Sequence, residues 1–588
     1  MSLFRRLLPF LFLLTLVAWP VTPALTQNSD DAEKSRLIRF VEDRLSSPNR
    51  QISLNGIQGT LSSDVSFDSI TISDENGTWL TIVNPRLQWS RASLLRGRLE
   101  IESLTAERIE WPRMPMADTS MPAPESSGFS LPELPVAVNI NELSIAEARF
   151  GEPVFGLESV LSLDGRLTLA DGSLDTELDV NRLDGPGGQL ALAAAYANES
   201  TQLDVNLSLR EPEDGVVANV LNIPDRPAVA LAVDGSGTLD DFSAELAFDV
   251  GGERTADGTL TLAADAGNGR LVNFDLAGPI AQILPEQHRA FFGAETALTA
   301  EVLLPEQGGV DIRQLELDSG ALDVTASAST LADGFLRELS ADATLRSADA
   351  AAVRLPVPGE PITVENGAIS LRYGINGADS WTLTGTVDGI TLPDAEIGTV
   401  RIDGNGAITG LDDPDRRAIT FKLDGGVEGI RPEDPAVARA VGDTITVAAE
   451  GGWAAGEPVR IASAAVTGKA LRIAAQGLIE DLTFKGKTRV EASDLEAFSL
   501  VADRDLAGSA ALNADGDIAL AGGAFDLTFD GTLTDAHIGS DAADRLLAGE
   551  TTLTGRAART PEGLSFSDLD ISNDQTTVRV DGTYATRE

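Results

Sequence analysis

The chain has 588 residues, of which 43% are hydrophobic but only 5% aromatic, and its formal net charge is −47. Binding to a nucleic-acid backbone needs clustered Lys and Arg, so we expect no nucleic-acid partner. The acidity instead fits a long, strand-rich surface that charge keeps soluble. The sequence contains no Cys, so disulfides and thiolate metal sites are not available to it.

The first 27 residues have the pattern of an export segment. Arg5 and Arg6 precede an apolar stretch from Leu7 to Leu25 that Pro and Thr interrupt. A cleaved signal peptide and a retained inner-membrane anchor both fit this pattern, and either one places the rest of the chain outside the cytoplasm. The apolar residues assigned to this segment include Leu7, Phe10, Leu14, Val17, Trp19 and Leu25.

Residues 28–47 predict an amphipathic helix. Asp30 and Glu33 have the spacing of a capping box, and Leu37, Val41 and Leu45 fall on one helical face. We expect this helix to plug the open end of the sheet that follows. The alternative, a helix that lies on the membrane, is disfavoured by its mixed charges.

A short apolar pattern recurs along the chain, with two alternating positions, two spacers and two more alternating positions. Alternation with period two predicts a strand with one apolar face, and the extra spacer predicts a bulge or bend. The sequence therefore predicts an all-β fold, an elongated, repetitive antiparallel sheet that is curved, groove-forming and taco-like or solenoid-like, with a few short helices. The copies are Val65/Phe67/Ile70/Ile72, Leu99/Ile101/Leu104/Ala106, Val138/Ile140/Leu143/Ile145, Val310/Ile312/Leu315/Leu317, Val459/Ile461/Ala464/Val466 and Leu564/Phe566/Leu569/Ile571.

Composition divides the rest of the chain into three regions. Residues 48–113 form a strand-rich domain that holds three of the six Trp residues, and residues 114–135 form a Pro-, Ser- and Met-rich linker. A β-repeat region follows over residues 136–588, with short helices predicted near residues 214–221, 279–292 and 494–502. The first region is locally basic, and its arginines are expected on an exposed strand face, with contact to lipid headgroups or a partner as the alternative. They are Arg86, Arg91, Arg96, Arg98, Arg108 and Arg113.

Residues that carry chemistry are almost absent. His288 and His537 are the only histidines and lie far apart in the sequence, and no nucleophile-elbow motif is present. The acidic stretches at residues 403–406 and 513–517 lack a complete calcium loop and are predicted to be hairpin turns. We therefore expect no catalytic, cofactor or metal site, and a protein that is not an enzyme.

One stretch alternates cleanly enough to suggest a binding surface. Leu203, Val205, Leu207 and Leu209 occupy every second position of a predicted strand. If no second sheet covers this face, burial of apolar area remains open to lipid acyl chains, so these four residues are the candidate groove lining. Two alternatives stay open: a secreted or surface β-repeat protein, such as an adhesin, with a closed core, and a secreted hydrolase built around His288 or His537.

The amino-terminal region resembles a known family. Residues 49–63 (NRQISLNGIQGTLSS) look like the start of TamB, the translocation and assembly module subunit of the AsmA-like superfamily, in its alphaproteobacterial form. Shorter matches follow at residues 74–80, 87–89, 94–99 and 109–112, and the stretch from Leu284 to Gly293 (LPEQHRAFFG) resembles a second family segment.

The resemblance implies a location, partners and a role. Family members are anchored in the inner membrane and span the periplasm as a long curved β-sheet with an apolar groove. They partner the outer-membrane barrel TamA and are implicated in outer-membrane protein assembly, autotransporter secretion and phospholipid transport. They are usually longer and end in a characteristic carboxy-terminal domain, whereas this chain stops at Glu588 within strand-like repeats.

Overall fold

The computed structural model describes residues 42, 46, 50–60, 63–116, 131, 136–346, 351–561, 563–574 and 577–585. Strands make up 64% and helices 9%, which confirms an all-β fold built on an open sheet with few short helices. The chain divides into two compact units, Met1–Pro285 with Ala294–Gly308, and Glu286–Gly293 with Gly309–Glu588. The described residues contain no helix that is long and apolar enough to cross a membrane, and the export segment at residues 1–27 lies outside them.

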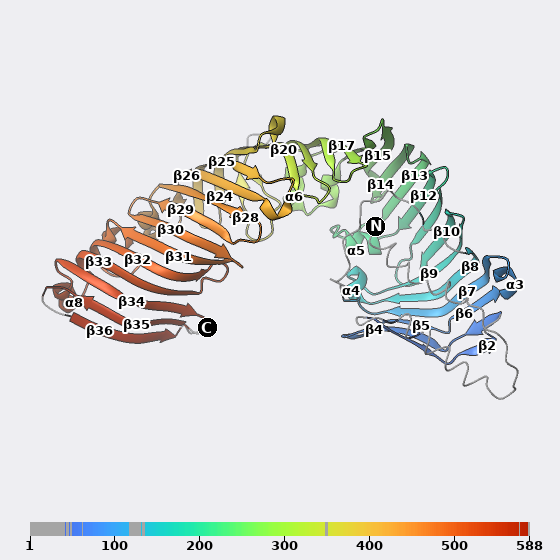
Figure 1. Ribbon diagram of the computed structural model, residues 1–588, viewed down its shortest axis with the longest axis horizontal. Helices are drawn as coiled ribbons and strands as arrows, with labels where there is room; N and C mark the ends of the chain where they lie inside the picture. The colour runs from blue at the N-terminus through green and yellow to red at the C-terminus, as the bar shows by residue number, and fades with distance from the viewer. Residues whose placement is uncertain are drawn as a thin grey trace. The chain divides into compact units, whose positions relative to one another are not determined.

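The first unit is a series of strands that lie side by side (Figure 1). From β8 to β17 each strand pairs antiparallel with the next, and short turns or helices connect them. Its strands are β1 (Gln51–Asn55), β2 (Gln58–Thr60), β3 (Asp64–Ser66), β4 (Ser69–Asp74), β5 (Gly77–Val83), β6 (Arg86–Ser90), β7 (Arg98–Trp111), β8 (Ala137–Phe150), β9 (Ser159–Ala170), β10 (Ser173–Arg182), β11 (Gln189–Ala197), β12 (Gln202–Glu211), β13 (Val229–Thr238), β14 (Asp241–Val250), β15 (Glu253–Asp265), β16 (Gly269–Gly278) and β17 (Thr296–Pro305). Its helices are α3 (Arg91–Leu94), α4 (Glu152–Phe155), α5 (Val216–Val220) and η2 (Ile280–Ile283).

The second unit continues the same design. Strands β18, β19, β20, β23, β24, β25, β26 and then β28 through β36 pair antiparallel in that order. The strands are β18 (Asp311–Asp318), β19 (Leu322–Thr330), β20 (Leu336–Arg346), β21 (Val353–Arg354), β22 (Thr363–Val364), β23 (Asn366–Tyr373), β24 (Ser380–Leu392), β25 (Ala395–Thr409), β26 (Ala418–Glu428), β27 (Arg431–Pro432), β28 (Thr444–Ala454), β29 (Val459–Thr467), β30 (Leu471–Glu480), β31 (Thr483–Ala492), β32 (Ala507–Ala519), β33 (Phe525–His537), β34 (Glu550–Thr560), β35 (Gly563–Ser572) and β36 (Thr577–Ala585). The helices are α6 (Glu286–Phe292), η3 (Ile375–Gly377), η4 (Pro414–Arg416), α7 (Pro435–Val441), η5 (Leu495–Phe498) and α8 (Asp541–Leu546).

The recurring apolar pattern marks β-bulges, as predicted, in five of its six copies. The ladder register shifts inside the pattern in β7, β8, β18, β29 and β35, so that the apolar residues on both sides of the extra spacer keep the same face. The first copy departs from the prediction, because Val65 belongs to β3 while Ile70 and Ile72 belong to β4. Between them the amides of Phe67 and Asp68 donate to Pro85 and Asn55, so the backbone leaves one ladder and joins another.

Strands β7 and β8 form a parallel pair, joined by the segment predicted to be a linker. Leu99 faces Val138 and Trp111 faces Phe150, so the pairing runs along both strands and the sheet continues past this connection. The described ends of the segment are fastened to the sheet. Within the segment, the Met116 amide donates to Asp74 at 3.0 Å and the Leu131 amide donates to the Asn198 side chain at 2.8 Å. Just before it, Arg113 forms an ion pair with Asp74 at 2.5 Å and thereby lowers the pKa of that carboxyl.

Of the predicted amphipathic helix at residues 28–47, only Glu42 and Ser46 lie in the described part of the chain. Glu42 is helical, and its carboxylate accepts a hydrogen bond from the Leu54 amide at 2.7 Å. The Ser46 hydroxyl accepts another from the Ile52 amide at 3.0 Å. Both amides belong to the edge of β1 that does not pair with β4, which fits a segment that caps the open end of the sheet.

A second predicted helix, over residues 279–292, is two pieces. Residues 280–283 form η2, and α6 begins at Glu286. Pro285 has no amide hydrogen and restricts the residue before it, and Leu284 is correspondingly extended.

The hairpin turns predicted at residues 403–406 and 513–517 are wrong, because these stretches lie inside β25 and β32. Glycine serves another purpose there. A Cβ on Gly404 would lie 2.8 Å from the Leu423 side chain, and one on Gly406 would lie 2.6 Å from Nε1 of Trp381. Glycine in these strands therefore makes room for large neighbours on the adjacent strands.

We expect Gly406→Ala to destabilise the second unit by about 1–3 kcal/mol through overpacking. Its new methyl group would approach the Thr420 carbonyl to 1.9 Å and displace the Trp381 indole, which donates to that carbonyl at 3.0 Å. Hydrogen exchange should become faster in β24, β25 and β26 of the full-length chain. Gly582→Ala in β36 is the control, since no atom lies within 4 Å of its added Cβ, and equal protection in the two variants would contradict the prediction.

Candidate functional site

The strands of the first unit place their apolar residues on one face of the sheet. At the level of Leu207 in β12, the neighbours across the ladder are Leu192 in β11 and Val233 in β13, and Val233 in turn faces Leu246 in β14. Successive side chains of a strand point to opposite faces, so the residues between them line the other side. We call the side with Leu207 the apolar face of the first unit.

All four lining residues predicted from the sequence lie on this face. Leu203, Val205 and Leu207 are half-buried, and Leu209 is buried. Between them stand Asp204, Asn206 and Ser208 on the polar face. The same alternation runs through β10 and β14, where Asp and Glu fill most of the polar positions.

Among the described residues of the first unit there are three buried clusters. One joins Ile52, Ile72, Leu80 and Ile82 to Ala106 of β7 near the amino-terminal end of the sheet, and two more lie further along the sheet. In one of these two, Val229 and Val250 pack with Ala218 and Ile223 of the α5 region. In the other, Leu99, Ile101, Val138, Ile140 and Leu169 pack with Trp89. Between these two clusters no second layer of strands packs on the face in the part of the chain that the structure describes, and Leu192, Leu207, Val233 and Leu246 of one middle row are half-buried.

The charged side chains on this face lie near the ends of the strands. Arg182 is buried at the end of β10, where it donates to Asp184 at 3.1 Å and to the Asp214 carbonyl at 2.9 Å. Glu211 ends β12 and accepts from the Val217 amide at 2.7 Å. The side chains in the middle of the apolar face are therefore all uncharged.

The second unit carries a comparable apolar row that the sequence did not reveal. The ladder joins Ile369, Gly385, Ile402, Gly425, Val447, Val466 and Ile473 across β23 to β30. Large apolar side chains in this row are unusually open, with Ile369 47% and Val447 41% exposed. Glycine occupies this row in β24 and β26, as Gly385 and Gly425, which weakens the apolar alternation in those two strands. The row becomes visible only when the strands are aligned in register, because its members lie opposite one another on neighbouring strands.

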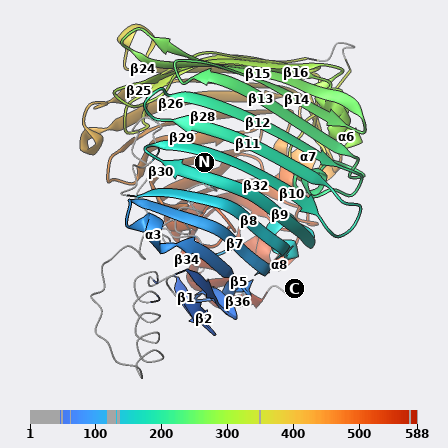
Figure 2. The same cartoon turned by 90° about the vertical axis from the view of Figure 1, so that its right-hand side faces the viewer.

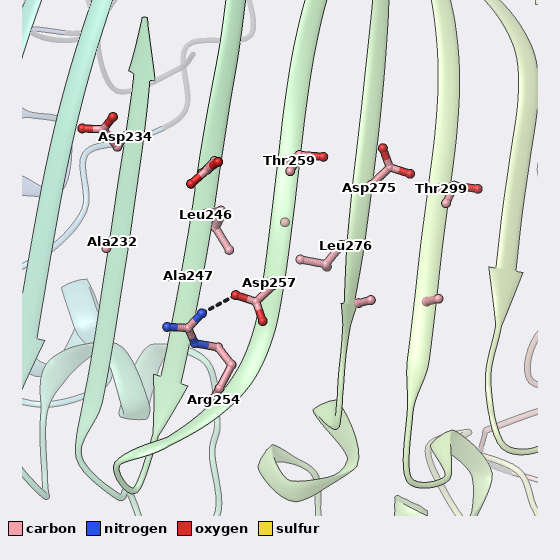
Figure 3. Close-up of a pocket in the computed structure, with 14 residues that line it drawn as sticks. Ala232, Asp234, Leu246, Ala247, Arg254, Asp257, Thr259, Asp275, Leu276 and Thr299 are labelled. Carbon is pink, nitrogen blue, oxygen red and sulfur yellow. Dashed lines mark hydrogen bonds and ion pairs between the residues drawn. The ribbon is translucent and has the colours of Figure 1, made fainter.

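The polar face holds a shallow hollow of about 470 Å³ over β13 to β17 (Figure 3). Small residues such as Ala232 and Ala277 form its floor, and carboxylates such as Asp234 and Asp275 surround it. Arg254 forms ion pairs with Asp257 and Asp249 at its rim. The hollow lies on solvent-exposed strand surface, and no group of His, Asp or Glu among the described residues is arranged to hold a metal ion.

The two histidines lie in different elements. His288 belongs to α6, and its Nε2 lies 3.3 Å from Nε2 of Gln287. His537 is the last residue of β33, and its Nε2 lies 3.6 Å from a carboxylate oxygen of Asp544. The four predicted lining residues thus lie together on an apolar face that extends over several strands. Among the described contacts, neither histidine contacts a serine that could act as a nucleophile.

Comparison with known proteins gives no relative for this chain. A scan against models of protein families, a search of curated proteins and a search of solved structures each found no match.

Proposed function

We propose that this chain is a TamB-like, AsmA-like component of the bacterial cell envelope that carries phospholipid acyl chains along its apolar faces. In this proposal the export segment anchors the chain in the inner membrane or is cleaved after export, and the remainder lies in the periplasm. Its partners are the inner membrane, phospholipid and an outer-membrane TamA-like barrel, and its role is to assist outer-membrane protein assembly and lipid transport. No covalent step is involved.

The observation that supports the proposal is an extensive apolar face, over whose middle no second layer of strands packs among the described residues. Burial of apolar area contributes roughly 25 cal/mol per Å², so an acyl chain that lies along the middle rows gains contact that the protein itself leaves unused. The absence of charged side chains from these rows of the first unit suits a hydrocarbon tail and not a headgroup, because an unpaired charge is costly beneath an apolar ligand.

Photo-crosslinking in cells tests the proposal. A photoreactive residue at Val205 or Leu207 should form phospholipid adducts, whereas one at Asn206 or Ser208, on the opposite face of the same strand, should not. If the inward positions gave no lipid adducts in a folded chain, the conduit would be wrong, and a structural β-repeat protein would be favoured.

A further inference from the structure

A small basic projection stands at the beginning of β7 in the first unit. It comprises α3 and the turn that follows, residues 91–98, and we call it the arginine turn. Figure 2 shows α3 at one end of the strands. Leu95, the C-cap residue of α3, is 86% exposed, the highest exposure of any large apolar residue described.

The six arginines of the amino-terminal region fall into two groups. Arg86 pairs with Asp64 at 2.6 Å, Arg108 with Glu147 at 3.5 Å and Arg113 with Asp74 at 2.5 Å. The other three, Arg91, Arg96 and Arg98, all belong to the arginine turn, are exposed, and form no ion pair with a described residue. The sequence expectation of arginines on an exposed strand face therefore holds for Arg86 in β6 and for Arg98, the first residue of β7. Arg91 instead lies in α3 and Arg96 in the turn after it, and Arg113 follows the end of β7.

The arginine turn is held firmly by contacts at its base. Ser90 caps α3 by accepting a hydrogen bond from the Ser93 amide, and the buried Ser93 hydroxyl donates to Glu100 at 2.5 Å. Leu94 packs against the cluster that contains Ile101. Leu94 thus packs into the buried cluster, whereas its neighbour Leu95 remains exposed to solvent.

We propose that the arginine turn docks on an anionic phospholipid bilayer, with Leu95 inserted among the headgroups and Arg91, Arg96 and Arg98 bound to lipid phosphates. A leucine flanked by guanidinium groups has the chemistry of an interfacial membrane contact. The net charge of −47 repels an anionic surface, so only a local positive patch such as this one provides attraction. The export segment lies in the same amino-terminal part of the chain, which would bring the arginine turn near a membrane. This inference does not require lipid on the apolar face.

The absence of Cys from the sequence allows a direct test with one reporter. Ala92→Cys places an environment-sensitive fluorophore on the exposed side of α3 in the full-length protein. Vesicles that contain phosphatidylglycerol should shift its emission to the blue, vesicles of phosphatidylcholine alone should not, and added salt should reverse the shift. The shift should be lost in Arg91→Gln/Arg96→Gln/Arg98→Gln and reduced in Leu95→Ser.

Two controls separate local docking from attachment through the export segment. A fluorophore at Val220→Cys in α5, which follows β12, reports from the opposite end of the strands and should not respond. Along the strand direction, the 10-residue β12 alone spans roughly 33 Å. Arg166→Gln/Arg346→Gln/Arg431→Gln removes the same charge from exposed positions elsewhere and should leave the shift at residue 92 unchanged.

Equal emission in both kinds of vesicle, or a shift that survives the triple glutamine change, would overturn the proposal. A photoreactive residue at Leu95 that captured an acidic protein in cells, and no lipid, would also overturn it. Each of these three outcomes leaves the acyl-chain proposal standing, because that proposal depends on adducts at Val205 and Leu207.

Discussion

Leu207→Asp should remove most of the phospholipid that copurifies with the full-length protein while leaving the strands paired. Leu207 lies in a middle row of the apolar face, with Leu192 and Val233 on either side. The carboxylate is tolerated in the empty protein because this row is open to water. Beneath a bound acyl chain the carboxylate would lose its hydrating water without gaining a hydrogen-bond or ion-pair partner, at a cost of several kcal/mol. This cost corresponds to more than a tenfold loss of lipid affinity.

The matched control is Ser208→Asp, which adds the same charge to the next residue on the polar face. It should retain the lipid, as should Leu207→Met, which preserves the apolar character and volume of the side chain. Lipid is measured by mass spectrometry of the purified protein, and circular dichroism checks the fold. If Leu207→Asp retained as much lipid as the wild type, acyl chains would not use this face.

The sequence was sufficient to predict those features that depend on neighbours along the chain. Period-two alternation sets the face of each side chain. Leu203, Val205, Leu207 and Leu209 could therefore be assigned to one surface without knowledge of which strands pair. The bulge spacing was equally local, and it holds wherever one strand carries the whole pattern, as in β29 and β35. Conversely, the first copy failed because hydrogen bonds from Phe67 and Asp68 to distant residues divide it between two strands.

Features that depend on alignment between strands could not be read from the sequence. Gly404 and Gly406 suggested a turn, since glycine is common in turns, but their purpose is set by Trp381 and Leu423 on the adjacent strands. The apolar row through Ile402 and Val447 is invisible in either strand alone for the same reason. The arginine turn is a third case, because which arginines lack an acidic partner follows from the ladder and from loop geometry.

Deletion of Glu102 should be tolerated, whereas deletion of Asn206 should disrupt the first unit. Glu102 is the extra residue of the β7 bulge: Trp89 of β6 faces Ile101, and the preceding Gln88 faces Ser103. Without Glu102 the β6 pairing becomes continuous, and Leu104 keeps its face. Strand β8 would then pair with the shortened β7 across a bulge in β8. It already pairs with β9 in this way, because Ile140 and Leu143 face Leu167 and Gly165 across a bulge.

Strand β12 has no bulge against either neighbour, so it cannot absorb the loss of Asn206. A one-residue slip moves every side chain on one side of the deletion to the opposite face. Either Leu203 and Val205 or Leu207 and Leu209 must then turn toward the polar side, which exposes apolar area that is now partly buried, in addition to breaking ladder bonds. Hydrogen exchange of the full-length chain should show lost protection in β11 to β13 for the Asn206 deletion, and near-native protection in β6 to β8 for the Glu102 deletion. Equal damage from the two deletions would mean that the bulge does not set the register, and that the recurring apolar pattern reflects composition alone.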